Sequence, residues 1–122
     1  PLLEALDEAV YAAGRNILQL GGYMIFFNLL NLLPGIFLPD GRVCAPLLEI
    51  SGGLSILGDR WPLYTLLLLP AGGLCCLAQT GSCIRNTGLS LTGYFFHKLF
   101  LTGLTALYYL GWFLLRPDTF LR

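Results

Sequence analysis

Glu49 is the acidic residue whose surroundings best suit polar chemistry inside a membrane. It lies in the apolar stretch of residues 44–54, beside the glycine pair Gly52-Gly53. The other six acidic residues lie near the amino terminus, in short polar breaks, or close to the carboxyl end. An acid at bilayer depth costs about 2.5–3.5 kcal/mol on insertion scales, so it marks a functional site by default.

A carboxylate at that depth has several chemical uses. Glu49 could neutralise a cation, accept hydrogen bonds from a hydroxyl or amine of a ligand, or carry a proton. The glycines beside it predict backbone that leaves regular helix, which a membrane tolerates only where that backbone is buried in protein or lines a cavity. The structural alternative is that Glu49 pairs with Lys98, Arg85 or backbone amides and holds a joint together.

The expected ligand- or ion-binding site also draws on other polar residues and glycines of the apolar segments. Gln79 offers an amide that complements the acid, and Ser51 offers a hydroxyl. The alternative for the asparagines is interhelical hydrogen bonding, worth about 0.6 kcal/mol per bond, and Lys98 could instead extend to the interface. The predicted set is Glu49, Ser51, Gly52, Gly53, Gly72, Gly73, Gln79, Asn28, Asn31 and Lys98.

The composition is that of a membrane protein. The chain has 122 residues, a mean hydropathy of +0.72 and 11% charged residues, whereas soluble domains carry about 25%. Its formal net charge is zero, so no basic field attracts nucleic acid, and the expected partner is the lipid bilayer. We expect a single membrane domain over residues 1–122. Because the first residue is Pro1, we interpret the sequence as a fragment of a longer chain.

No residue pattern predicts an enzyme or a cofactor site. Ser-His-Asp, HExxH and P-loop patterns are absent from the sequence. The four cysteines lie in or near apolar segments and are expected to be small core residues, and with a single histidine a structural zinc site is not expected. The alternative is a soft-metal path through Cys44, Cys75 and Cys83. We therefore expect no enzyme activity, no cofactor and no resident metal.

Three segments are transmembrane candidates. Residues 16–39 and 61–84 each form a run of 24 residues without a charge, which is longer than a hydrocarbon core of about 30 Å requires. The third candidate is residues 94–115. Residues 1–15 carry apolar side chains at a spacing of three and four, which predicts an amphipathic helix that lies at the interface or continues into the first span.

Glycine and proline interruptions predict broken helices between these spans. Residues 43–58 are 16 in number, too few to span comfortably, so we expect a re-entrant segment there. Pro34-Gly35 should kink or end the first helix, and residues 70–73 should break the second. The predicted fold is all-α: a polytopic membrane protein with about three transmembrane helices plus a re-entrant or broken-helix hairpin.

Several motifs together resemble the carboxyl-terminal half of the YlbJ-type sporulation integral membrane proteins, of the nucleoside-recognition or Gate-domain group. The resemblance spans residues 15–115. Its motifs are Leu20-Gly21-Gly22 before Phe26, Leu47-Leu48-Glu49-Ile50-Ser51-Gly52-Gly53, Gly72-Gly73-Leu74-Cys75, Gln79, and Tyr94 before Lys98. It implies paired helical elements and hairpins around a central site. The match carries over Glu49, Gly52, Gly53, Gly72, Gly73, Gln79 and Lys98.

The resemblance implies a protein of the bacterial cytoplasmic or forespore membrane, associated with endospore formation. The leading functional hypothesis is transport of a small polar solute or an ion, and a cation is one such ion. The partners it implies are a second copy of the chain or the missing membrane half. Two alternatives stay open: a structural or scaffolding membrane module, in which glycines and asparagines serve helix packing, and a ferrous-iron-type metal permease.

Overall fold

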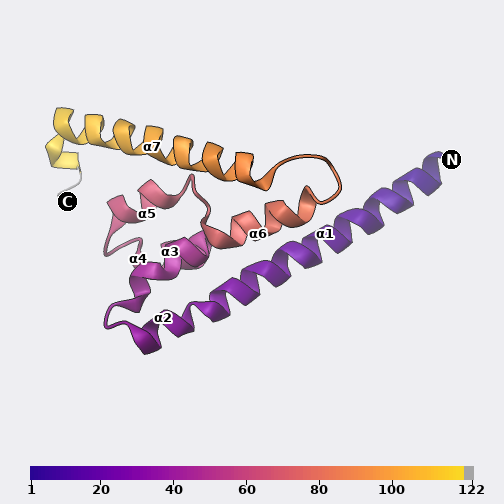
Figure 1. The fold of residues 1–122 in the computed structure, drawn as a ribbon, viewed down its shortest axis with the longest axis horizontal. Coiled ribbons are helices and arrows are strands. Elements are labelled where there is room, and N and C mark those ends of the chain that lie inside the picture. Colours follow the sequence, from indigo (N-terminus) through magenta and orange to yellow (C-terminus); the bar gives the residue numbers. More distant parts are fainter. Residues whose placement is uncertain (120–122) are drawn as a thin grey trace.

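The computed structural model describes residues 1–119, and every regular element in that range is a helix, which confirms the predicted all-α class. Figure 1 shows two long helices with a group of short ones between them. In chain order the elements are α1 (Leu2–Leu30), α2 (Leu32–Phe37), η1 (Gly41–Cys44), α3 (Ala45–Leu48), α4 (Ile50–Leu57), α5 (Pro62–Leu68), α6 (Gly73–Cys83), α7 (Leu91–Leu115) and η2 (Pro117–Thr119).

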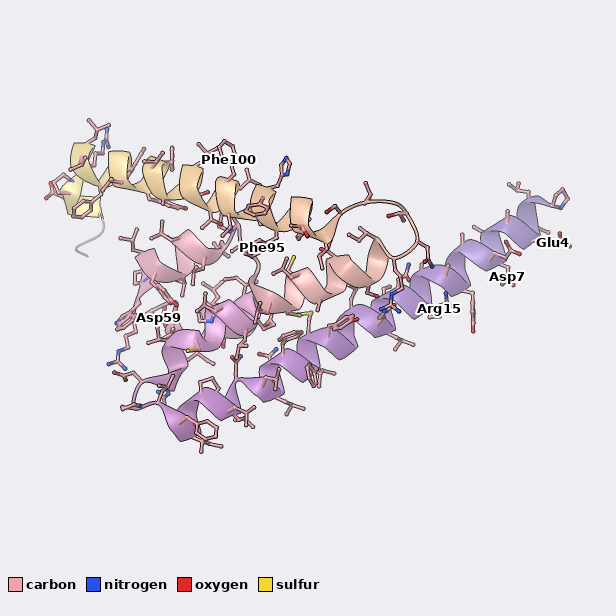
Figure 2. All side chains as sticks on the ribbon, viewed as in Figure 1. Glu4, Asp7, Arg15, Asp59, Phe95 and Phe100 are labelled. Carbon is pink, nitrogen blue, oxygen red and sulfur yellow. The ribbon has the colours of Figure 1, made fainter. Side chains whose placement is uncertain are left out.

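Three helical stretches are long and apolar enough to cross a membrane, as predicted. They are Leu2–Phe37, Pro62–Cys83 and Leu91–Leu115. The first has 36 residues, or about 54 Å of helix, which exceeds a core of about 30 Å even at the upper tilt of about 40°. The predicted amphipathic helix therefore continues straight into the first span. Figure 2 shows Glu4 and Asp7 on the end of α1 that extends past the other helices.

The first helix breaks at Asn31, three residues before the predicted Pro34-Gly35 interruption. α1 ends at Leu30, and α2 resumes at Leu32 and runs through Pro34 and Gly35 to Phe37. Proline has no N–H to donate to the carbonyl four residues earlier, and its ring clashes with that carbonyl. The carbonyl concerned belongs to Leu30, so the break precedes Pro34, which then occupies the tolerated first turn of α2.

The expectation that the glycine pair at 52–53 leaves regular helix is wrong. Gly52 and Gly53 lie inside α4, and the backbone leaves the helix at Glu49, whose φ of −146° and ψ of 120° are extended. Gly53 is buried because α4 packs directly against α3. A Cβ added at Gly53 would meet the backbone of Pro46. The glycines are therefore needed for the close approach of two helices rather than for a turn.

The second predicted break is present. α5 ends at Leu68, a turn follows, and α6 begins at Gly73. Gly72 and Gly73 both have a φ of +73°, a conformation that residues with a Cβ rarely adopt. The glycine pairs at 52–53 and 72–73 therefore differ in backbone conformation, since the first pair lies inside α4.

The short helices pack between the two long ones (Figure 1). α1 contacts α2, α3 and α6, whereas α7 contacts α5 and α6. The buried core is small and includes Ala45, Leu57 and Cys75. The chain exposes 9123 Å², compared with about 6,500 Å² for a compact monomer of this mass. Much of its apolar surface is thus left for lipid or for other protein.

Replacing Gly53 with alanine should destabilise the fold by about 1–3 kcal/mol, because the added methyl would overlap the Pro46 backbone. Reversible unfolding of the chain in detergent, followed by helical circular dichroism, measures the change. The matched control is Gly21→Ala, at a helical glycine with nothing within 4 Å. That variant should be neutral or more stable by up to about 1 kcal/mol. Equal stability of the two variants would contradict the packing described here.

Candidate functional site

The carboxylate of Glu49 caps the amino terminus of α4. Its Oε1 accepts a hydrogen bond from the Ser51 amide at 2.9 Å, and its Oε2 accepts one from the Gly52 amide at 2.6 Å. The residue is only 3% exposed. The first amides of a helix have no partner within the helix, and that end carries partial positive charge, so a carboxylate there is stabilised twice.

Asn28 connects this cap to α1. Its Nδ2 donates to Glu49 Oε2 at 3.2 Å and to the Met24 carbonyl at 2.9 Å. A Cβ added at Gly52 would meet Asn28 Oδ1, so α1 approaches α4 this closely only because residue 52 is glycine. Both carboxylate oxygens of Glu49 are thus engaged by donors of the chain itself, and the acid joins two separate helical segments.

The cap also changes the carbonyl end of α3. In a continuous helix the amides of Ser51 and Gly52 would donate to the carbonyls of Leu47 and Leu48, four residues earlier. Here those amides donate to the side chain of Glu49 instead. The carbonyl end of α3 is therefore released from helical pairing at the point where the backbone turns.

Those carbonyls lie against the amino end of α6. A Cβ added at Gly73 would stand 3.0 Å from the carbonyl oxygens of Pro46 and Leu47 and 3.1 Å from that of Leu48. Gly73 is the first residue of α6, and α3 ends at Leu48. The partial negative end of one short helix thus faces the partial positive end of another, which is electrostatically favourable. The break at Glu49, which the sequence did not predict, and the predicted break at residues 70–73 meet at this point.

Gln79 lies elsewhere than expected. Its amide donates to the Leu20 carbonyl at 3.3 Å and to Cys75 Sγ at 3.5 Å, so it joins α6 to α1 rather than complementing Glu49. Gln19 donates to the hydroxyl of Ser82 in the same interface. Sequence reasoning missed these two residues. The signal was a helical spacing of polar residues on both partners: Asn16, Gln19 and Tyr23 on α1, and Gln79, Ser82 and Cys83 on α6.

Asn31 and Lys98 stand apart from the Glu49 cluster. The amide nitrogen and oxygen of Asn31 are buried and have no hydrogen-bond partner among residues 1–119. Lys98 is on α7, with its Nζ 5.4 Å from the centroid of the Tyr94 ring. It lines a cavity together with Leu47 and Gly73. Buried polar atoms are nearly always paired, so the Asn31 amide has hydrogen-bonding capacity open to a ligand or to water.

The predicted site residues therefore divide into groups. Asn28, Glu49, Ser51 and Gly52 form one hydrogen-bonded cluster. The glycines at 53, 72 and 73 bring backbones together, and a Cβ at Gly72 would stand 2.8 Å from Cys76 Cβ. Binding of a ligand by any of these residues stays a prediction.

A metal centre has no geometric support in the described part of the chain. No group of three or more His, Cys, Asp or Glu side chains in residues 1–119 could hold a metal ion. Cys75 is buried, whereas Cys83 is exposed. The iron-permease alternative requires Cys44, Cys75 or Cys83 to face one pore, and this remains a prediction.

Replacing Glu49 with leucine should destabilise the fold strongly, because the Ser51 amide, the Gly52 amide and Asn28 Nδ2 would lose their acceptor. Each buried donor left unpaired costs about 1–3 kcal/mol. Glu49→Gln keeps one acceptor oxygen and should lose less stability than Glu49→Leu. Unfolding in detergent ranks the variants, with Glu4→Gln, on the exposed end of α1, as the control. If Glu49→Leu unfolds like the wild type, the cap does not hold the joint.

Comparison with known proteins gives this chain no family: no protein-family model, no curated protein and no solved structure matches it. The resemblance to the YlbJ-type membrane proteins therefore stays a prediction from the motifs.

Proposed function

We propose that the chain is one half of a Gate-type membrane assembly that moves a small polar solute or ion. The solute would pass where the end of α3, before Glu49, meets the start of α6 at Gly73. The observation that carries this proposal is the contact between the carbonyl end of α3 and Gly73 at the start of α6. Discontinuous helices whose ends meet within a membrane are characteristic of secondary transporters, where they provide backbone groups to the transported species.

The charges around the breaks favour a cation, or a solute with a cationic or hydrogen-donating group. The Glu49 carboxylate directly follows the carbonyl end of α3 in the chain. No Lys, Arg or His pairs with Glu49 among the described residues, since its partners are two amides and Asn28. The negative charge of the acid is therefore not cancelled by a neighbouring basic side chain.

A second protein surface completes the proposed pathway. The chain exposes 9123 Å², about 40% more than a compact monomer of this size, and α1 contains no buried residue although it carries Asn28. Polar groups at membrane depth normally face protein. A second copy, or another membrane half, is the partner that supplies this surface. From the resemblance of its motifs, the assembly is proposed to lie in the bacterial cytoplasmic or forespore membrane and to take part in endospore formation.

Glu49→Gln should lower solute uptake, measured on equal amounts of folded protein, because it removes the negative charge beside the contact between α3 and α6. The purified chain is reconstituted in liposomes, and uptake of radioactive sodium, rubidium and uridine is compared with uptake by empty liposomes. Glu4→Gln, at the exposed, projecting end of α1, is the control and should transport like the wild type. Wild-type uptake equal to that of empty liposomes for all three probes would overturn the transport proposal.

The second candidate is a structural or scaffolding module, which the complete engagement of the Glu49 carboxylate favours. In that case the helix breaks serve assembly alone. Glu49→Gln should then be tolerated in a sporulation assay, whereas a bulky residue at Gly52 or Gly72 should abolish the oligomer seen by cross-linking. Solute uptake by the wild-type chain that Glu49→Gln removes would exclude this alternative.

A further inference from the structure

Two apolar cavities follow one another along the inner face of α7. One, of about 400 Å³, lies between α5 and α7 and is lined by Leu63, Ala106 and Leu110 among others. The other, of about 210 Å³, is lined by Leu77, Lys98 and Leu99 among others. The α7 residues concerned recur at helical spacing and so share one face. Figure 2 shows Phe95, which lines the second cavity, on the side of α7 toward α6, and Phe100 on the opposite side.

We call the two cavities together the α7 groove. Lys98 is the charged residue that lines it. No acidic residue lines either cavity, and Lys98 forms no ion pair within residues 1–119. Its ammonium group instead lies over the Tyr94 ring, one turn nearer the amino end of α7, at 5.4 Å from the centroid. Tyr94 is itself held by a contact of 3.2 Å between its hydroxyl and Cys76 Sγ. A basic side chain inside a span without a counter-charge is a functional-site hypothesis by default.

Lys98 lies near the amino end of α7. It lies seven residues after Leu91, the first residue of α7, or about 10 Å along the helix. The Lys98 side chain extends back toward that end, as the contact with Tyr94 shows. From Lys98 to Leu110 the groove follows about 18 Å of helix, close to the thickness of one leaflet, about 15 Å.

We propose that this groove binds an anionic phospholipid, whose phosphate pairs with Lys98 and whose acyl chain lies along the face of α7 that carries Leu99, Ala106 and Leu110. Charge complementarity selects this occupant, because one unpaired cation stands at one end of an otherwise apolar groove. The cavities measure about 400 and 210 Å³, whereas 18 Å of helix occupies about 1,400 Å³, so a partner helix could insert only its side chains into them. This inference is independent of transport.

The bound lipid would fasten α7 to the rest of the chain. α7 contains no buried residue, and its contacts with the helices that precede it in the chain include α5 and α6. An acyl chain in the groove replaces missing side-chain contacts, and a phosphate neutralises Lys98. The position of α7 would then depend on the anionic lipid content of the membrane.

Lipid selectivity tests the proposal. The full chain is purified in detergent, delipidated, and titrated with phosphatidylglycerol or phosphatidylcholine of identical acyl chains, and bound lipid is counted by native mass spectrometry. We expect phosphatidylglycerol to bind about fivefold more tightly, the factor that corresponds to about 1 kcal/mol for one basic residue near an anionic membrane surface. Lys98→Gln should abolish this preference, and Lys98→Arg should keep it.

Two matched controls separate the site from general electrostatics and from loss of fold. Arg116→Gln removes a cation from the other end of α7, where it lies 6.0 Å from the Trp112 ring, and should keep the preference. Ala106→Trp fills the larger cavity and should weaken binding of both lipids, whereas Leu104→Trp, on an exposed position, should not. Circular dichroism verifies that each variant is folded.

Four outcomes would overturn the proposal. If Lys98→Gln still prefers phosphatidylglycerol, Lys98 does not select the lipid. If Arg116→Gln loses the preference as fully as Lys98→Gln does, the preference reflects general surface charge rather than this site. If free glycerol phosphate displaces bound lipid as strongly as added phosphatidylglycerol does, the site binds the headgroup alone and no acyl chain. A change of oligomeric state in Ala106→Trp without a change in lipid binding assigns the groove to a second copy.

Discussion

The fold depends on an exchange of hydrogen-bond acceptors at Glu49. Its carboxylate takes two amide donors, from Ser51 and Gly52, that would otherwise continue the helix from α3 into α4. The exchange ends one helix, begins another, and releases the carbonyl end of the first toward Gly73. A single buried side chain therefore produces the helix break, the attachment to α1 through Asn28, and the contact between the two broken segments.

Glycines make this arrangement sterically feasible, each in a different way. Gly52 leaves room for Asn28, Gly53 leaves room for Pro46, and Gly73 leaves room for three carbonyl oxygens. Gly72 and Gly73 also supply the positive φ at which the chain turns into α6. Backbone and side chain are thus matched at one place, and this consistency between local conformation and packing specifies a single structure.

The spans and the second break could be predicted from the sequence because both depend on local properties. An uncharged run of 24 residues defines a span by hydropathy alone, and Pro70 with two glycines ends a helix by backbone sterics. The depth of Glu49 in an apolar stretch also identified it as a central residue. The sequence pattern left open whether it binds a ligand or joins helices.

Other features could not be predicted because they depend on which segments meet. Glycine in a sequence does not say whether it turns the backbone or admits a neighbour, so the break was assigned to 52–53 rather than to Glu49. Gln79 looked like a partner for the acid, but it faces Leu20 across a helix interface that only the fold defines. The open amide of Asn31 likewise becomes apparent only when every neighbour has been placed.

The uninterrupted length of α1 has a mechanical consequence. Glu4, at the projecting end, and Asn28, at the buried cap, are joined by continuous helix, a stiff rod of about 36 Å. α1 therefore connects its acidic end through one stiff helix to the joint on which the fold depends.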